Sequence, residues 1–258
     1  MKIRYLLLAG VFLLAGLPVS CGEAKGTAVQ PQDPAPPKTK KVTINGAPVF
    51  LIDDSSYAEY PGGSPKKGTL ASDTLIDTGI STTLDTGAMK VQLAGGKEAG
   101  FYPDKTLNWG YLAEKTQVYG YNLRAERIEF YPGGKVMNAY LEKGAQICGY
   151  SPVDDYPVFF HESGSLKLIL PKHNLKTGGI EFQSNTMVSF YDSGAPARGI
   201  LAKDTEIDGL ILKGGTALML YPDGTIMMGT LAKPAAVKNK KFAAGDEIKF
   251  DLLGQTEK

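Results

Sequence analysis

The chain has little of several things that define common classes of protein. Only two of its 258 residues are cysteine, so a disulfide framework cannot support the fold. Its two histidines, His161 and His173, do not have the spacing of a metal site, and we expect neither a metal nor a cofactor. Apart from residues 5–19, no apolar run reaches the roughly 18 residues that a membrane helix needs.

The chain also lacks an excess of charge of either sign. It has 28 basic and 27 acidic residues, and removing residues 1–20 takes away only Lys2 and Arg4, which leaves 26 basic against 27 acidic residues. A protein without a basic field has nothing with which to hold a polyanion. We therefore expect no nucleic acid partner.

The N-terminus has the layout of an export signal. Lys2 and Arg4 precede the uncharged apolar stretch 5–19, and Ser20 and Cys21 follow it at once. This stretch is too short for a spanning helix and has the order of charged, apolar and small residues that a secretory signal peptide has. We predict a signal peptide over residues 1–20.

The cysteine behind this stretch resembles the lipobox of bacterial lipoproteins, in which the cysteine thiol receives a diacylglycerol and becomes the new N-terminus. Ser20 fits that pattern, whereas Pro18 stands where the family prefers leucine. The resemblance implies that Cys21 carries acyl chains such as palmitate, which anchor the protein in the membrane. Gly22, in place of the aspartate associated with inner-membrane retention, implies the outer membrane. An ordinary secretory leader with an incidental cysteine is the alternative.

Residues 21–41 read as a tether. The segment 24–41, AKGTAVQPQDPAPPKTKK, has four prolines and almost no large apolar residue. Such a composition cannot form a core and favours an extended, solvated chain. We place the folded domain at 42–253 and a short C-terminal tail at 254–258.

A motif of an aromatic residue, a turn and a glycine recurs six times within 42–253. Its lead residues are Tyr60, Tyr102, Tyr131, His161, Tyr191 and Tyr221, at intervals of 42, 29, 30, 30 and 30. A near-constant period predicts tandem repeats of about 30 residues, with half a unit at each end. His161 replaces tyrosine in the fourth copy, and we expect it to pack like the tyrosine.

The turn and strand signals predict an all-β fold. Tyr221-Pro222-Asp223-Gly224 is typical of a hairpin turn in which glycine takes a positive φ, and Asp204-Thr205 is a second turn signal. Runs of about six β-formers lie between such turns. We predict antiparallel hairpin repeats, with about three strands per unit, that form an elongated, twisted meander or coiled sheet.

Four glycines recur inside strands rather than at turns: Gly68, Gly110, Gly199 and Gly229. A glycine inside a strand often marks close approach of another part of the chain. We expect each to let one unit pack closely against the next. Trp109, the only tryptophan, is either a core residue or an exposed contact, and Cys148 is expected to be a small packing residue.

The portion Tyr-Pro-x-Gly-x-hydrophobic-x-x-Gly resembles the MORN-type repeat, in the variant found in bacterial antitoxin-like proteins. It is also similar to arrays in outer-membrane lipoproteins. The similarity covers part of each unit across 57–232, and the period departs from it, at about 30 residues against about 23. Proteins with such repeats bind varied partners, so the resemblance implies a fold more than an activity.

One motif raises the possibility of catalysis. Asp85-Thr86-Gly87 has the form of an aspartic peptidase signature, in which two aspartates share a proton. Asp77-Thr78-Gly79 lies only 8 residues upstream, too close for the two to come from separate lobes. We expect hairpin turns here and no enzyme, with an aspartic-type peptidase as a remote alternative.

Together these features predict a lipid-anchored lipoprotein of the bacterial cell envelope. Its repeat domain would serve as a binding or scaffolding surface, because repeat arrays present long faces. The expected partners are the membrane, through the lipid, and a protein or envelope ligand. A structural role in association with peptidoglycan is the alternative.

Overall fold

The computed structural model describes residues 35–78, 89–237 and 240–251. The chain divides into two compact units, residues 1–36 and 37–258. The export signal, Cys21, the tether as far as residue 34 and the tail at 254–258 lie outside the described residues. In the second unit every described element is a β-strand, and no membrane-crossing helix occurs in the described part of the chain.

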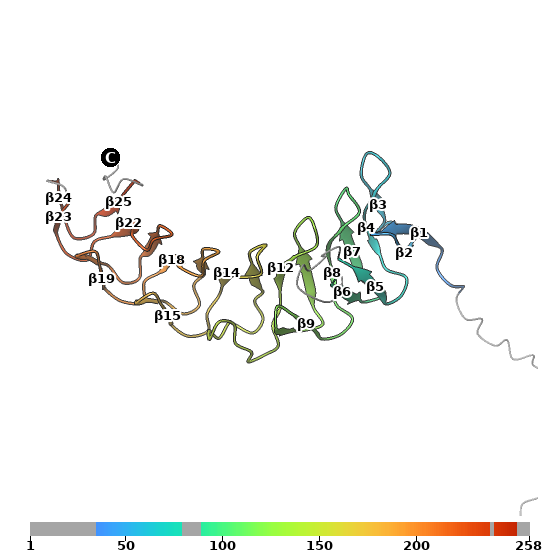
Figure 1. The fold of residues 1–258 in the computed structure, drawn as a ribbon, viewed down its shortest axis with the longest axis horizontal. Helices are drawn as coiled ribbons and strands as arrows, with labels where there is room; N and C mark the ends of the chain where they lie inside the picture. The colour runs from blue at the N-terminus through green and yellow to red at the C-terminus, as the bar shows by residue number, and fades with distance from the viewer. Residues whose placement is uncertain (1–34, 79–88, 238–239, 252–258) are drawn as a thin grey trace, which may run out of the picture. The chain divides into compact units, whose positions relative to one another are not determined.

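Thirteen strands form one large antiparallel sheet (Figure 1). They are β3 (Ala58–Glu59), β4 (Pro65–Thr69), β7 (Glu98–Phe101), β8 (Leu107–Tyr111), β11 (Arg127–Phe130), β12 (Val136–Ala139), β13 (Val158–Phe160), β14 (Leu166–Ile169), β17 (Val188–Phe190), β18 (Pro196–Ile200), β21 (Ala217–Leu220), β22 (Ile226–Thr230) and β25 (Glu247–Lys249). Neighbouring strands of this sheet follow one another in chain order. The predicted all-β antiparallel meander is therefore confirmed.

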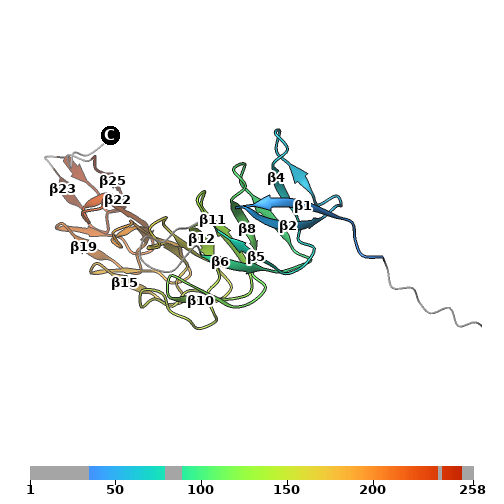
Figure 2. The same ribbon diagram turned by 45° about the vertical axis from the view of Figure 1, so that its right-hand side comes forward.

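The remaining strands form separate two-stranded hairpins. They are β1 (Thr39–Ile44) with β2 (Ala47–Ile52), β5 (Thr74–Asp77) with β6 (Lys90–Leu93), β9 (Thr116–Val118) with β10 (Tyr121–Leu123), β15 (Leu175–Thr177) with β16 (Ile180–Phe182), β19 (Thr205–Ile207) with β20 (Leu210–Leu212), and β23 (Ala235–Val237) with β24 (Lys240–Phe242). We call these the small hairpins. Several of them lie along one side of the large sheet (Figures 1 and 2).

The chain alternates between the large sheet and the small hairpins. Between Tyr191 and Tyr221 it forms β18, then the hairpin β19–β20, then β21. This stretch of about 30 residues therefore holds four strands, two that belong to the large sheet and two that form a small hairpin. The expectation of about three strands was wrong, because the small hairpin reads as a single strand in the sequence.

Four of the small hairpins are hidden in the sequence because their turns have only two residues. Both residues of each such turn have positive φ: Asn45-Gly46, Tyr119-Gly120, Gly178-Gly179 and Asp208-Gly209. Cys148-Gly149 forms a similar turn between the bridged Ile147 and Tyr150. This is the backbone of a type I′ turn, whose twist matches that of the flanking strands and which favours glycine at its second position. The motif Ile-x-Gly therefore marks a reversal of the chain.

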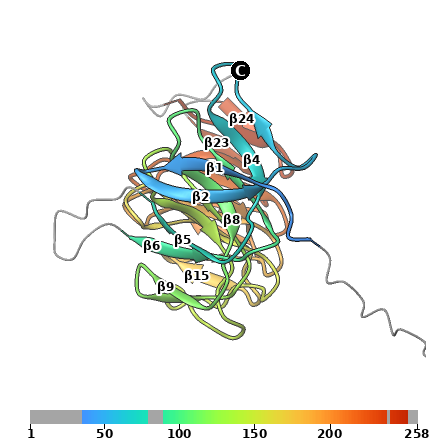
Figure 3. The same cartoon turned by 90° about the vertical axis from the view of Figure 1, so that its right-hand side faces the viewer.

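The core lies between the large sheet and the small hairpins. The inner face of the sheet contributes Phe101, Phe130 and Phe160, each with an exposed fraction of at most 1%, and the hairpins contribute residues such as Leu93 and Phe182. These side chains belong to one continuous hydrophobic cluster. Viewed along the sheet, the hairpins and the strands stack behind one another (Figure 3).

Among the described residues, single β-bridges join five of the six small hairpins to the chain beside the large sheet, and another bridge joins Pro152 to Pro171 outside those hairpins. The bridged pairs are Leu51 with Leu70, Leu93 with Leu112, Leu123 with Leu141, Pro152 with Pro171, Phe182 with Leu201 and Leu212 with Leu231. The bridged leucines and Phe182 are almost fully buried, so each bridge closes around core side chains. The small hairpins and the large sheet are thus joined both by backbone hydrogen bonds and by a common core.

Candidate functional site

The lead tyrosines connect consecutive hairpins of the large sheet. Each hydroxyl donates to the carbonyl oxygen that precedes the next lead position: Tyr60 to Phe101 (3.0 Å), Tyr102 to Phe130 (2.8 Å), Tyr131 to Phe160 (2.9 Å), Tyr191 to Leu220 (2.7 Å) and Tyr221 to Phe250 (2.8 Å). Nε2 of His161 lies 2.9 Å from the carbonyl oxygen of Phe190, and its protonated tautomer donates the same bond. Six neighbouring hairpin junctions are held in one way.

At Tyr102, burial favours the protonated form of the phenol that its bond requires. It raises the pKa of Tyr102 above its ordinary value, and the nearby carboxylate of Glu129 raises the pKa further. A phenol that stays protonated stays a donor. The bond from Tyr102 to Phe130 therefore persists at the pH of ordinary buffers.

The four strand glycines lie where the small hairpins meet the large sheet. A Cβ atom at Gly68 would stand 3.1 Å from Cδ1 of Leu51, and one at Gly110 would stand 2.7 Å from Cδ1 of Leu93. Gly229 meets Leu212 in the same way, and a Cβ atom at Gly199 would overlap the ring of Phe182. The residues that cover these glycines are the residues that make the β-bridges.

The outer face of the large sheet carries one unbroken row of cross-strand partners, which we call the outer row. From β3 to β25 it consists of Ala58, Lys67, Gly100, Trp109, Glu129, Asn138, Phe159, Leu168, Ser189, Arg198, Met219, Met228 and Lys249. Partners directly opposite each other in a sheet share a face. The outer row therefore crosses all thirteen strands on the side away from the core.

Aromatic, charged and amide groups meet in one part of the outer row. Trp109 lies over Gly100, where no side chain could fit beneath the indole. The guanidinium carbon of Arg127 stands 4.6 Å from the centroid of the Trp109 ring, and Arg127 pairs with Glu129 at 2.8 Å. Asn138 donates to the second oxygen of Glu129 at 2.7 Å. Trp109 is thus half-buried on the outer face and is not part of the core cluster.

The rest of the outer row alternates between apolar and polar stretches. Phe159 and Leu168 form one half-buried apolar pair, and Met219 and Met228 form another. Ser189 and the exposed Arg198 separate them. Methionine adapts its shape readily, so such a face can fit an irregular surface.

Of the two Asp-Thr-Gly motifs, only Asp77 and Thr78 belong to the described residues. Asp85, Thr86 and Gly87 lie outside the described residues. Asp77 ends β5 and pairs in register with Lys90. No group of three or more potential metal ligands occurs among the described residues.

Cys148 is not a packing residue, contrary to the expectation. It is exposed and has a φ of 51° in a two-residue turn. Its sulfur stands 3.7 Å from the hydroxyl of Tyr121. Near this turn it is Tyr150 that packs, with its ring stacked on that of Phe190 at a centroid distance of 5.7 Å.

Sequence reasoning also missed the partners of the second turn signal. The carboxylate of Asp204 accepts from the amide of Gly214, ten residues away, at 2.8 Å. Asp73 binds the amide of Gly95 in the same manner at 2.7 Å. These bonds tie the turn after the large-sheet strand to the turn that ends the small hairpin. The recurring pairing of Asp-Thr with a later Gly-Gly was the available signal.

Compared with known protein families and with curated proteins, the chain matches no family model and no curated protein.

Proposed function

We propose that the protein is a lipid-anchored lipoprotein of the bacterial cell envelope whose tandem repeats of about 30 residues form a binding or scaffolding surface. The outer row carries this proposal, because it offers one face that crosses thirteen strands. The lead-residue bonds hold consecutive hairpins at fixed positions along that face. A long face built of similar units suits an extended partner.

The anchor rests on the sequence around Cys21. Ser20-Cys21 behind an apolar leader supports acylation, and Gly22 supports retention in the outer membrane. Stable anchoring takes more than one acyl chain, since each buried methylene contributes only about 0.8 kcal/mol. The tether would then separate the repeat domain from the lipid.

Labelling with an alkyne analogue of palmitate tests the anchor. The wild type should incorporate the label and fractionate with outer membranes. Cys21→Ser should lose both, whereas Cys148→Ser should keep both, which makes the second cysteine the matched control. Labelling of the Cys21→Ser variant would refute acylation at this residue.

Site-specific photo-crosslinking in intact cells tests the surface. A crosslinking amino acid replaces Arg198, which is exposed on the outer row, or Gln117, which is exposed on the small hairpin β9–β10. We expect a discrete adduct from position 198 and none from position 117. Equal yields would refute a specific role for the outer row, and adducts to peptidoglycan would favour the structural alternative.

A further inference from the structure

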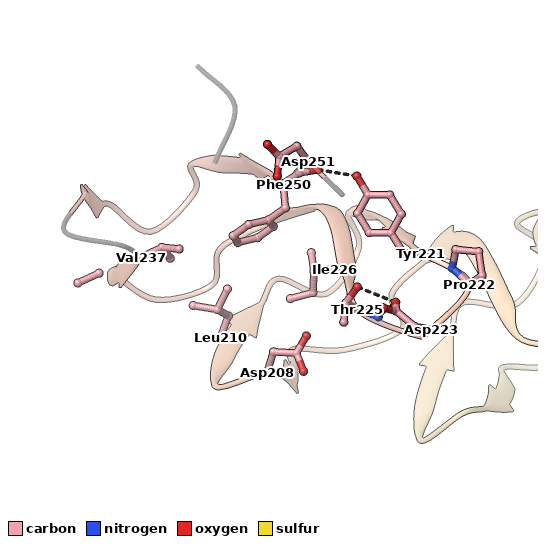
Figure 4. Close-up of a pocket in the computed structure, with 11 residues that line it drawn as sticks. Asp208, Leu210, Tyr221, Pro222, Asp223, Thr225, Ile226, Val237, Phe250 and Asp251 are labelled. Atoms are coloured by element: carbon pink, nitrogen blue, oxygen red, sulfur yellow. Dashed lines mark hydrogen bonds between the residues drawn. The ribbon is translucent and has the colours of Figure 1, made fainter. Parts of the chain in front are cut away.

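A pocket of about 730 Å³ lies where the small hairpin β19–β20 faces the last turn of the large sheet (Figure 4). Its apolar lining includes Leu210, Ile226, Val237 and Phe250. In Figure 4 the ring of Phe250 and the side chain of Ile226 lie in the middle of the group. A pocket of this size and apolar character is in the range that binds small organic molecules.

The polar part of the lining is acidic. Asp208 and Asp223 contribute carboxylates, and none of the described residues that line the pocket is basic. Hydrogen bonds from the hydroxyl and then the amide of Thr225 lower the pKa of Asp223, so this carboxylate stays ionised at neutral pH. An apolar pocket with carboxylates in its lining favours a ligand that carries a positive charge.

The same place in an earlier hairpin is filled by a phenol ring. Tyr119 and Asp208 each precede glycine in a two-residue turn, with φ of 50° and 51°. The Tyr119 ring makes an edge contact with Phe160, with centroids 5.3 Å apart, and its hydroxyl accepts from the amide of Val136 at 3.2 Å. The side chain at this turn position therefore points into the space between two hairpins of the large sheet.

The residues that surround the Tyr119 ring correspond to residues that line the pocket near Asp208. Val136 pairs with Phe130 at a bulge, as Ile226 pairs with Leu220. The carbonyl oxygen of Phe160 accepts from a lead tyrosine, as that of Phe250 does. With similar walls, the short side chain of Asp208 leaves open the volume that the tyrosine ring fills.

We propose that this pocket binds a small aromatic amine, whose ring takes the place that Tyr119 fills in the earlier hairpin and whose ammonium group faces the carboxylates. The ring gains burial against Ile226 and Phe250, and the charge is complementary to Asp208 and Asp223. The site lies apart from the outer row. The result of a binding test at this pocket therefore does not depend on whether the outer row is a scaffolding surface.

Calorimetric titration of the purified protein with tyramine tests the proposal. Tyramine has a phenol ring and an ammonium group. The control ligands are 3-(4-hydroxyphenyl)propionate, which has the same ring with a carboxylate, and hexylamine, which has the charge without a ring. We expect tyramine to bind at least about tenfold more tightly than either control, a difference of about 1.4 kcal/mol. Equal affinities for tyramine and hexylamine would overturn the proposal.

Variants locate the binding. Asp208→Tyr should abolish it by filling the volume, with folding checked by circular dichroism. Asp223→Asn should weaken it by roughly two- to fivefold, the effect of one partly exposed charge. The matched control is Asp104→Asn, since Asp104 accepts from Thr106 as Asp223 does from Thr225 but lies in a distant turn. Equal losses in the two Asn variants would contradict the assignment, and so would tyramine binding by a folded Asp208→Tyr variant.

A shortened chain tests whether the protein's own C-terminal residues, rather than a ligand, occupy the pocket. If the wild type fails to bind tyramine but a variant that ends at Asp251 binds it, then the chain's own residues 252–258 occupy the pocket. That result would overturn the proposal. Binding by neither protein would overturn it as well.

Discussion

The ring of Phe182 lies directly against the backbone of Gly199, where a Cβ atom would overlap ring atoms. Phe182 ends β16 and forms a β-bridge with Leu201, and Gly199 lies two residues before that bridge in β18. Leu212 and Gly229 have the same relationship. A small hairpin thus packs closely against the large sheet only because the sheet has no side chain at that point.

Gly199→Ala should destabilise the protein. The added methyl group must displace the fully buried Phe182 ring, and overpacking of this kind costs about 1–3 kcal/mol. Urea denaturation measures the loss. Gly62→Ala is the matched control, because a Cβ atom there meets nothing within 4 Å and the backbone does not need glycine. Equal effects at the two positions would contradict the close contact.

Tyr131→Phe should lower the free energy of unfolding by about 0.5–1.5 kcal/mol, because it removes the bond to the carbonyl oxygen of Phe160. Tyr156→Phe is the control, since among the described residues the hydroxyl of Tyr156 donates only one long hydrogen bond, to the sulfur of Met187 at 3.9 Å. Thermal unfolding of both variants checks this. A neutral Tyr131→Phe variant would show that the junction bonds contribute nothing to stability.

Cys148→Gly should stabilise the protein by about 1 kcal/mol, because Cys148 has the left-handed backbone that costs residues with a Cβ atom about that much. Cys148→Val should destabilise it, since branching at Cβ disfavours this conformation further. Cys148→Ala removes the thiol and keeps the backbone preference, and so isolates any contribution from the contact with Tyr121. The midpoint of thermal unfolding ranks the variants, and a Gly variant below Ala would contradict the turn geometry.

The carboxylate of Asp192 should make stability depend on pH. Hydrogen bonds from the hydroxyls of Ser163 and then Ser165 lower its pKa below the ordinary value of 3.8. Because the pKa is lower in the folded state, the stabilisation is present above the unfolded pKa and is lost as the pH falls through the folded pKa. Asp192→Asn should therefore be less stable than the wild type at neutral pH and match it in strong acid.

Urea denaturation at several pH values checks this dependence. The same substitution in a Ser163→Ala/Ser165→Ala background is the control and should show a smaller pH-dependent difference, because the charges of His161 and Lys135 also lower the pKa of Asp192. A difference that persists in strong acid would mean that the effect of Asp192→Asn does not come from ionisation.

Tyr119→Ala should open a cavity at the β9–β10 turn. We expect this cavity to correspond to the pocket that Asp208 leaves open at the β19–β20 turn. Because the tyrosine is 38% exposed, we expect a loss of about 1–3 kcal/mol, less than for a fully buried ring. Added phenol should restore part of the stability of this variant and leave the wild type unchanged, as thermal unfolding would show. No recovery with phenol would contradict the correspondence between the two places.

The turns of the large sheet could be predicted from the sequence. Tyr221-Pro222-Asp223-Gly224 predicts a turn with glycine at positive φ, and Gly224 has a φ of 88° with its amide donating to Tyr221. Such a turn depends on four consecutive residues, so local composition is enough to predict it. The all-β antiparallel class followed from the alternation of these turns with strand-forming runs.

The residues that contact each other from different strands could not be predicted in this way. The sequence near Asp204 does not indicate that Gly214 is its partner. The sequence near Trp109 likewise does not indicate its contacts with Gly100 and Arg127. These pairings depend on the register of strands from different hairpins, which the packing of the whole core sets. The sequence by itself determined the fold class and the turns of the large sheet. The tertiary structure alone decided the outer row and the open place at Asp208, because a face and a pocket exist only once distant strands lie side by side.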